Sequence, residues 1–381
     1  MKIHYVVPHF HPDVGGVEDH VMRLAKYMTG RGHEVTVHTS RKSISGVTLP
    51  PQEDLHGILV RRYEPGLSLG YYATMFRPAI AEGDIVHAHG YAFLPADFSI
   101  RHYRGRMGAI LTAHHGVRMT PPNLRGRVLR MLYDRYGLRT LRKADKVFAS
   151  SDADKRWMTE RRVRTEKIEV IPDGIPDEAF APGDRSFASR RGLGDYILFL
   201  GRVHKEKCVE HLLTALARLK RPGLQLAVVG PDGGAIAALR QTAKSLGIEE
   251  SVKILGLVSE EEKRGLLAGC SLLALPSLYE AQGLVILEAW AQGRPVVASR
   301  VGGVPYMVTD GTDGILYDWG DIDQLTAAIS GLVDDRAAAN KIGAAGKSTA
   351  LRSYRWSSVA ARIEQIYVEV VAGRPWKHKH K

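Results

Sequence analysis

Cysteine is scarce in this sequence, and long apolar runs are missing. The 381 residues include two cysteines, Cys208 and Cys270, which are too few for a disulfide framework, so we expect both to be reduced packing residues. No run of 18 apolar residues occurs, and the opening residues 1–8 are too short and too soon interrupted to form a signal peptide. These absences predict a cytoplasmic protein without a membrane-spanning helix.

Three common binding motifs are also missing. Gly15-Gly16, in the turn between an expected strand and helix, lacks the three-glycine pattern of dinucleotide sites, so dinucleotide binding is disfavoured. His87, His89, His114 and His115 follow apolar strands, but no Asp-x-Asp pair accompanies them, and we predict no metal site there. Despite a formal net charge of +12, no nucleic-acid-binding module is recognisable, so no nucleic-acid partner is expected.

The sequence does contain a regular alternation of strand and helix patterns. Breaker residues at 172–176 and at Pro182-Gly183 divide it into two halves. Strands that alternate with helices predict an α/β fold with two doubly wound sheets, each covered by helices on both faces. The expected strands are 2–7, 34–39, 57–62, 84–88, 109–113, 146–149 and 168–171 in the first half, and 196–200, 224–229, 252–255, 271–275 and 295–298 in the second.

Two cations follow the strand expected at 196–200. Arg202 and Lys207 lie in the turn between this strand and an amphipathic helix. Arg offers a planar fork of donors and Lys a mobile charge, and at the carboxyl end of a parallel strand the two together suit a pyrophosphate. Gly15-Gly16 occupies a similar turn in the first half, where its N–H groups could approach a phosphate. Each group alone is equally typical of an ordinary surface turn.

Two carboxylates, Glu280 and Glu288, lie eight residues apart in the second half. Glu280 falls in the loop after an apolar strand, and Glu288 lies on a helix that begins near Gly283. The N–H groups of Gly283, Leu284 and Val285 would face the loop and favour a diphosphate there. Glu280 is placed to accept hydrogen bonds from sugar hydroxyls, and Glu288, about two turns away, to reach a ribose. Standing alone, both would be read as solvated acids.

In this order and spacing, the motifs resemble those of the family 4 retaining glycosyltransferases, over nearly the whole chain. The resemblance implies the GT-B fold, with two Rossmann-like domains, residues 1–175 and 176–356, facing a cleft, and residues 357–381 crossing back to the first domain. The opening segment is most similar to enzymes that glycosylate phosphatidylinositol or similar lipids. The shared segments are Gly15-Gly16-Val17-Glu18, Thr112-Ala113-His114, Ile171-Pro172-Asp173-Gly174-Ile175, Gly201-Arg202 with Lys207, Glu280 with Glu288, and Gly302-Gly303-Val304-Pro305.

The resemblance also implies roles for single residues. The catalytic groups would be Glu280, Arg202, Lys207 and His114, which lies beside the reacting carbon; His115 replaces His114 if the alignment shifts by one. The donor-binding residues would be Gly15, Gly16, Arg202, Lys207, Leu257, Glu280, Gly283, Leu284, Val285 and Glu288. Protein donors and cations would offset the charge of the leaving diphosphate, so neither a metal nor another cofactor is expected. The donor would be a nucleotide diphosphate sugar of the GDP-mannose or UDP-hexose type, attacked on the face from which the diphosphate leaves.

The sequence departs from the family pattern at three positions. Gln282 stands where the family usually has Phe, Asp173 where it has Asn, and Tyr306 where it has Glu. Gln282 is the closest of the three to the expected donor sugar. An amide in place of an aromatic ring could reshape the pocket around the hexose, so the identity of the sugar stays open.

Positive charge gathers between residues 101 and 143, where eleven basic residues accompany one acid, Asp134. The segment 123–143 predicts a basic helix with apolar content. Such helices bind anionic membrane surfaces, and at ~1 kcal/mol per basic residue half of these charges would suffice. We expect a membrane contact on the acceptor side of the cleft; a plain solvated face is the alternative. The basic residues assigned to that contact are Arg125, Arg127, Arg130 and Arg135.

The sequence thus predicts an enzyme at the cytoplasmic face of a membrane that transfers a hexose to a lipid acceptor of the phosphatidylinositol or polyisoprenoid type. The alternatives are a soluble acceptor and a noncatalytic nucleotide-sugar sensor. The presence of Glu280 and His114, both sugar-site groups, favours an enzyme over a sensor. A GT-B phosphorylase is a further class, but no segment resembles the lysine region that binds pyridoxal phosphate in such enzymes.

Overall fold

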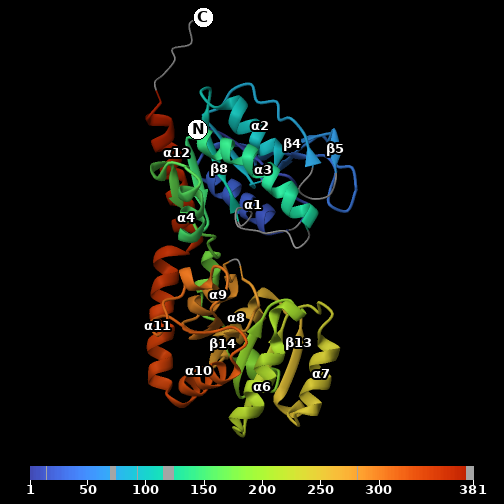
Figure 1. Cartoon of the computed structure of the whole chain (residues 1–381), viewed down its shortest axis with the longest axis vertical. Helices are drawn as coiled ribbons and strands as arrows, with labels where there is room; N and C mark the ends of the chain where they lie inside the picture. Colours follow the sequence, from blue (N-terminus) through green and yellow to red (C-terminus); the bar gives the residue numbers. More distant parts are fainter. Residues whose placement is uncertain (14, 69–73, 92, 115–123, 281, 375–381) are drawn as a thin grey trace, which may run out of the picture. The chain divides into compact units, whose positions relative to one another are not determined.

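The computed structural model describes residues 1–13, 15–68, 74–91, 93–114, 124–280 and 282–374. The chain separates into two units, Met1–Pro172 with Val359–Lys381, and Asp173–Ser358 (Figure 1). The predicted boundaries, after residues 175 and 356, lie three and two residues from the observed ones. Each unit is built around a sheet of mainly parallel strands.

Unit 1, residues 1–172 with 359 onward, contains an eight-stranded sheet in the order β10-β9-β8-β7-β1-β2-β4-β3. Of these strands, β3 alone is antiparallel to its neighbour. A separate hairpin pairs β5 (Leu67–Ser68) with β6 (Thr74–Met75). The strands of the sheet are β1 (Lys2–Val6), β2 (Glu34–Ser40), β3 (Gln52–Leu55), β4 (Ile58–Tyr63), β7 (Ile85–His89), β8 (Gly108–Thr112), β9 (Lys146–Ala149) and β10 (Ile168–Val170).

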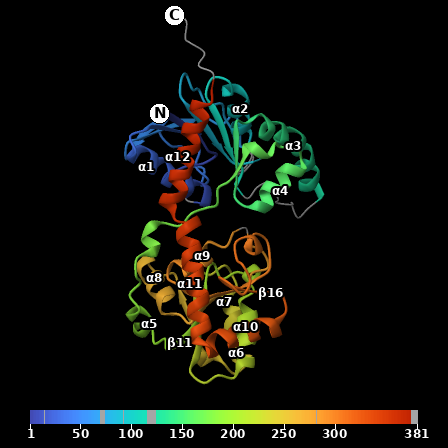
Figure 2. The ribbon, with the colours of Figure 1, turned by 90° about the vertical axis from the view of Figure 1, so that its left-hand side faces the viewer.

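The helices of unit 1 bury the faces that their periodicity predicts. In α1 (Gly16–Gly30), the buried side chains include Val21, Leu24 and Met28, which recur at helical spacing. α2 (Leu94–Tyr103) and α3 (Leu124–Lys143) share one apolar cluster with alternate residues of β7 and β8. α4 (Asp152–Glu160) follows β9. The C-terminal helix α12 (Trp356–Ala372) runs along unit 1 in Figure 2 and contributes five buried residues.

Two hydrogen bonds attach α12 to the buried sheet. Tyr367 Oη lies 2.6 Å from His87 Nδ1 on β7 and 3.4 Å from Tyr5 Oη on β1. At the helix surface, Glu364 pairs with Arg31 and His33, which follow α1. The last helix of the chain is therefore part of the first unit, as the family resemblance implies.

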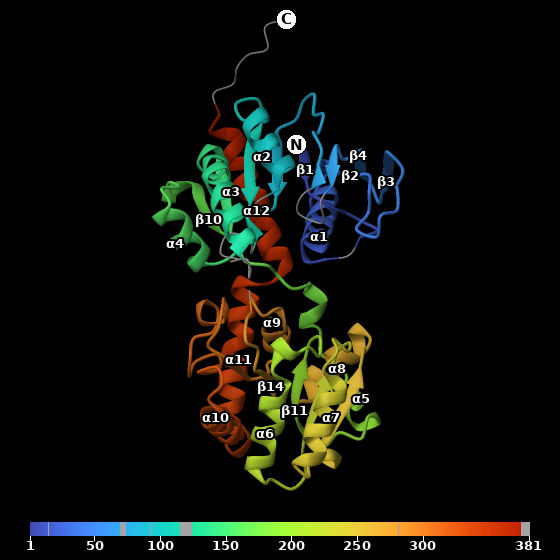
Figure 3. The same cartoon turned by 45° about the vertical axis from the view of Figure 1, so that its right-hand side comes forward.

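Unit 2, residues 173–358, has a fully parallel six-stranded sheet in the order β13-β12-β11-β14-β15-β16. Its two central strands, β11 and β14, are labelled in Figure 3. Its strands are β11 (Asp195–Leu200), β12 (Leu224–Val229), β13 (Val252–Gly256), β14 (Leu272–Leu275), β15 (Val296–Ser299) and β16 (Ile315–Tyr317). Its helices are α5 (Ser186–Arg190), α6 (Val209–Leu219), α7 (Ile236–Ser245), α8 (Glu260–Gly269), α9 (Leu284–Ala291), α10 (Ile322–Asp334) and α11 (Arg336–Ser353). Numbered within the unit, this is the doubly wound order 3-2-1-4-5-6, which changes direction between β11 and β14.

Both faces of the unit 2 sheet are covered. Tyr196, Leu198 and Leu200 of β11 belong to one apolar cluster, whereas Ile197 and Phe199 belong to the other. This alternation follows from the two-residue period of a strand, and a strand that is apolar on both faces reads as a continuous hydrophobic run.

The predicted α/β class with two doubly wound sheets is confirmed. The short polar strand β3 and the three-residue strand β16 were not predicted, because neither carries a long apolar run. The basic helix expected at 123–143 is α3, which begins at Leu124. Within the described part of the chain, no helix has the length and apolar composition that crossing a membrane requires.

Candidate functional site

The switch point of the unit 2 sheet brings two predicted residues together. In open α/β sheets, ligands bind beyond the carboxyl ends of the strands at the place where the strand order reverses, here between β11 and β14. Lys207, in the turn after β11, donates from Nζ to Glu280 Oε1 over 2.5 Å. Ser277, just after β14, donates from Oγ to the same carboxylate oxygen over 2.7 Å. The sequence did not single out Ser277.

Arg202 lies in the same turn and is exposed. The backbone on either side of it is fixed: Gly201 N–H donates to Val229 O (2.9 Å) and Val203 N–H donates to Pro231 O (2.8 Å). These bonds join the turn after β11 to the loop after β12. The guanidinium of Arg202 is thus attached to a fixed backbone and is open to solvent beside the sheet edge. This arrangement suits the binding of an anion from solution.

The backbone of Glu280 is held by the glycines after β15. Gly303 N–H donates to the Glu280 carbonyl over 2.8 Å. Gly302 has φ +54°, and a Cβ at this position would overlap the same carbonyl. Glycine is therefore required at 302 both for its left-handed conformation and for the close approach of the two backbones. The Gly302-Gly303 motif positions Glu280 and does not itself supply a functional side chain.

Glu288 lies on α9, within reach of a lysine that the sequence analysis missed. Lys263 Nζ on α8 is 2.8 Å from Glu288 Oε1 and 2.7 Å from Glu260 Oε2. Burial alone would lower the pKa of Lys263, but the two carboxylates raise it above its usual value. Lys263 is thus charged at neutral pH and forms an ion pair with Glu288, the residue expected to reach a ribose.

The other predicted donor-binding positions of unit 2 lie at the same sheet edge. Gly283, with φ +76°, precedes the first residue of α9, where Leu284 is exposed and Val285 is half-buried. The first backbone N–H groups of a helix lack intrahelical acceptors and favour an anion. Leu257, immediately after β13, is 76% exposed. An apolar side chain held in solvent at this edge is available to a planar base.

In unit 1, the strand order reverses between β1 and β7, and histidines gather beside that point. His114, two residues after β8, lies 3.1 Å through Nε2 from His89 Nδ1 at the end of β7. Its φ is +46°, a conformation that is uncommon for residues other than glycine and that clusters at functional sites. The ring of His20, on α1, meets the His114 ring edge-on at 5.3 Å. Burial lowers the pKa of His89 well below its usual value, so this histidine is neutral.

One of the four histidines expected to line the cleft differs from that expectation, and another cannot be placed. His87 is fully buried, and its two ring nitrogens meet Tyr367 and Thr112 at 2.6 Å each, so it attaches α12 and is not a cleft residue. His115 lies outside the described residues. Gly15 is the N-cap of α1 and Gly16 is its first residue, so both glycines lie at the predicted start of a helix.

Gln282 makes a contact that the sequence analysis did not predict. Its Nε2 donates to the Asp173 carbonyl over 2.9 Å, and its Oε1 accepts from Asp173 N–H over 3.2 Å. The oxygen and the nitrogen of the side-chain amide thus both form hydrogen bonds with the backbone of Asp173, the first residue of unit 2. The amide fixes the segment entering the unit, and this contact explains why a polar side chain is buried at this position.

The basic helix α3 packs on α2 through one face. Tyr133 donates to Asp97 over 2.6 Å, and Leu138 packs against the unit 1 cluster. On the outer face, the exposed residues Met131, Arg135, Arg139 and Arg142 recur at spacings of four, four and three, which form one stripe of a helix. The side chains of Arg125, Arg127 and Arg130 lie outside the described part of the structure.

Comparison with known proteins matches each half of the chain to a glycosyltransferase family model. Residues 14–179 match the model described as Glycosyltransferase Family 4, and residues 187–349 match Glycosyl transferases group 1. D-inositol 3-phosphate glycosyltransferase from Mycobacterium marinum is 31% identical over 364 residues, which cover 86% of this chain and 75% of the relative. This chain belongs to the family 4 glycosyltransferases. The enzyme of the same name from Mycolicibacterium paratuberculosis is 30% identical, with 91% of this chain and 83% of the relative covered.

Solved structures confirm the predicted GT-B fold of this glycosyltransferase. HepE from Anabaena, in complex with UDP, matches with a TM-score of 0.76 and 21% identity over 97% of this chain and 100% of that one. Sucrose-phosphate synthase from Thermosynechococcus elongatus matches with a TM-score of 0.75 and 22% identity, over 98% and 100% of the two chains. The glycosyltransferase motifs thus coincide with the two switch points: Lys207 and Glu280 in unit 2, and His114 in unit 1.

Proposed function

We propose that this glycosyltransferase moves a hexose from a nucleoside diphosphate sugar to an acceptor hydroxyl, with retained configuration and without a metal in the reaction. The observation that carries the proposal is the contact of Lys207 with Glu280 at the β11/β14 switch point. One group is a cation suited to a phosphate and the other a carboxylate suited to sugar hydroxyls. Without a donor the two groups neutralise each other, and a bound donor would engage both.

The proposed chemistry relies on positive charge supplied by the protein. Lys207, Arg202 and the first N–H groups of α9 would stabilise the diphosphate as the sugar–phosphate bond breaks. Preorganised donors of this kind contribute about 2.7–4 kcal/mol each to the transition state. His114 would contact the sugar beside the reacting carbon. The acceptor oxygen would attack from the side of the departing phosphate, and the proton of the acceptor would leave with the phosphate oxygen.

Lysine substitutions in the turn after β11 test the phosphate site. Lys207→Met should lower kcat/KM about 10²–10³-fold, because it removes one charge-stabilising donor. Lys205→Met is the matched control: Lys205 is exposed in the same turn, and its loss should leave the rate unchanged. Arg202→Ala should resemble Lys207→Met. Wild-type rates in both Lys207→Met and Arg202→Ala would refute the assignment.

The donor class follows from a binding panel. GDP, UDP, GDP-mannose and UDP-glucose should be compared by calorimetry, since HepE was solved with UDP and with UDP-glucose. We expect one diphosphate and its sugar to bind far more tightly than the others. EDTA should leave transfer intact, because the protein supplies the positive charge. Loss of transfer that only a divalent cation restores would refute the metal-independent mechanism.

We propose a lipid acceptor of the phosphatidylinositol type, reached from the membrane surface through α3. The support is the exposed stripe on α3, in which Met131, 61% exposed, stands in line with Arg135, Arg139 and Arg142. Basic helices with an apolar residue on the same face bind in the headgroup region of anionic membranes. At ~1 kcal/mol per basic residue near the surface, these three arginines would contribute about 3 kcal/mol.

Vesicle sedimentation tests the membrane contact. The wild type should sediment with phosphatidylserine or phosphatidylinositol vesicles at low salt, poorly with neutral vesicles, and less as salt rises. Replacement of Arg135, Arg139 and Arg142 by Gln should release it, as should replacement of Arg125, Arg127, Arg130 and Arg135. Donor binding should survive both sets, because none of these arginines is among the predicted donor-binding residues. Equal binding to neutral and anionic vesicles would remove the support for a lipid acceptor.

A soluble acceptor is the second candidate, favoured by the name of the relatives. They are D-inositol 3-phosphate glycosyltransferases, and a phosphorylated inositol ring is also the headgroup chemistry of phosphatidylinositol. Transfer assays should therefore offer D-inositol 3-phosphate in solution and phosphatidylinositol in vesicles. Transfer to the soluble compound alone would decide for a soluble acceptor.

A further inference from the structure

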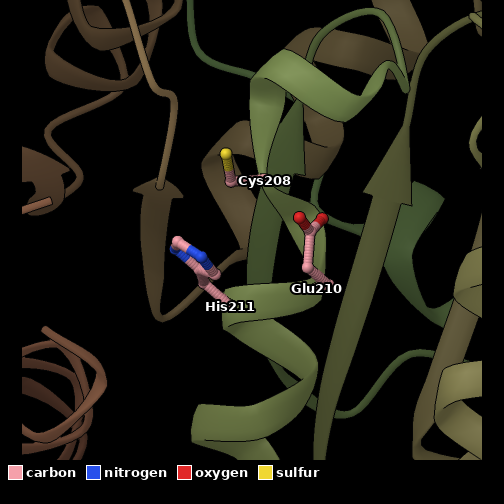
Figure 4. Close-up of side chains that lie close together, drawn as sticks. All are labelled: Cys208, Glu210 and His211. Carbon is pink, nitrogen blue, oxygen red and sulfur yellow. The ribbon is translucent and has the colours of Figure 1, made fainter. Parts of the chain in front are cut away.

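Three side chains that can ligate metals meet at the start of α6, next to the turn that carries Lys207. Figure 4 shows Cys208, Glu210 and His211 on neighbouring positions of this helix start. Their Sγ, carboxylate oxygen and imidazole nitrogen all lie within 4.8 Å of one another, and they are the single such group of three among the residues that the structure describes. We propose that these three residues bind one Zn²⁺ ion.

The imidazole of His211 gives independent support. Its Nδ1 is buried and has no hydrogen-bond partner. A buried polar atom without a partner costs about 1–3 kcal/mol, and native structures usually satisfy such atoms. The other polar contact of His211 fixes its position, since its backbone N–H donates to the Cys208 carbonyl over 3.0 Å. A metal ion beside Nδ1 would provide the missing partner.

Cys208 occupies an unusual backbone conformation that directs its thiol. It has φ +49° and ψ +40°, in the left-handed region, and it is the N-cap of α6. Residues other than glycine are held there at a cost of about 1–3 kcal/mol, commonly at sites with a function. Its thiol donates to the Lys205 carbonyl over 3.4 Å and to the Glu206 carbonyl over 3.7 Å, which places the sulfur at the start of α6.

The ligand types select zinc among the common divalent ions. Thiolate, imidazole and carboxylate are its usual ligands, at about 2.3, 2.0–2.1 and 2.0–2.2 Å. Magnesium and calcium prefer oxygen ligands throughout. Glu210 is exposed on the first turn of the helix, so its flexible side chain can close on an ion held by the other two. Three protein ligands leave a fourth tetrahedral position for water.

A bound ion would tie the short helical turn Lys205–Lys207 to α6. Cys208 directly follows this turn, and its sulfur lies 3.4 Å from the Lys205 carbonyl. The ion would therefore stabilise the segment that presents Lys207 and take no part in sugar transfer. This role is structural, and a metal titration tests it without a measurement of sugar transfer.

Metal binding to the full chain tests the proposal. Purified protein stripped of metal should be titrated with Zn²⁺ against a chromophoric chelator, and the wild type should take up one equivalent. Cys208→Ser and His211→Gln should weaken binding at least about tenfold. Glu210→Gln should also weaken it, whereas Glu206→Gln, a neighbouring exposed acid, is the matched control and should bind as the wild type does.

Cobalt gives a spectroscopic readout of thiolate ligation that is separate from the affinity measurement. Co²⁺ bound by the wild type should show the intense thiolate-to-metal charge-transfer absorption that cysteine ligation produces. The band should be absent in Cys208→Ser and present in Cys270→Ser, whose thiol lies in the core. Failure of the wild type to bind one equivalent, an absent band, or unchanged binding by Cys208→Ser would each overturn the proposal.

Discussion

Adding one methyl group at Gly302 should inactivate the enzyme through Glu280. Gly302 has φ +54°, and a Cβ there would overlap the Glu280 carbonyl, which the Gly303 N–H also contacts. Because the overlapped atom is a backbone oxygen and not part of a mobile side chain, the loop carrying Glu280 must shift. A misplacement of about 1 Å at a reacting centre costs on the order of 10²-fold in rate. We therefore expect Gly302→Ala to lower kcat/KM about 100-fold.

Gly311 provides a matched control for the backbone strain. It has φ +74°, but nothing lies within 4 Å of the position of its Cβ. Alanine at either site incurs about 1–2 kcal/mol for a left-handed conformation, and only Gly302→Ala adds the overlap. Urea unfolding and steady-state kinetics of both variants separate the two effects. If Gly302→Ala and Gly311→Ala lose the same stability and both keep wild-type kinetics, the positioning role of Gly302 is refuted.

Three further predictions concern the ribose contact, the buried histidines and the last helix. Glu288→Gln should weaken binding of the bare nucleoside diphosphate and of the sugar nucleotide, whereas Glu280→Gln should affect mainly the sugar nucleotide; equal effects on the bare nucleotide in calorimetry would contradict these roles. Burial lowers the pKa of His87 and His89 well below 6.5. Below that pH the two histidines become protonated in the unfolded chain but stay neutral in the folded one. The unfolding free energy should therefore be at its full value above about pH 6.5. Below that pH it should fall by up to about 1.4 kcal/mol per pH unit for each histidine. An unfolding free energy that stays constant between about pH 7.5 and about pH 5.5 would disprove this. Tyr367→Phe should cost about 1–3 kcal/mol in urea unfolding, because it leaves a buried ring nitrogen without a partner, and a smaller loss would show that the contact is not needed.

The strands that carry the fold were predictable because they are buried on both faces. β11 and β14 are continuous apolar runs, and their bounds fall within one residue of the predicted ones. β16 was missed because three residues after a turn give no period to detect. This strand is recognised only by its pairing with β15, and that pairing is visible in the folded structure but not in the sequence.

The candidate site was predictable where a motif coincides with a strand end, and not where a contact joins distant segments. Lys207 and Glu280 were expected together, and the structure places them 2.5 Å apart. The role of Gln282 was not foreseen, because its partner Asp173 lies 109 residues away. Lys263 lies 25 residues before Glu288 on another helix. A single surface lysine carries no signal in the sequence, so only the packing of α8 on α9 shows this contact.

The return of α12 to the first unit determines the order in which the molecule can be completed during synthesis. Unit 2 is one continuous segment, Asp173–Ser358, whereas unit 1 is interrupted by it. At ~5–20 residues per second, the ribosome needs roughly 10–40 s to pass from the end of the first segment of unit 1 to Tyr367. During that time His87 and Tyr5 lack the hydroxyl that contacts them in the finished protein. The domain that leaves the ribosome first is therefore the one that is completed last, and chaperones would meet it with the part of its sheet that contacts Tyr367 still uncovered.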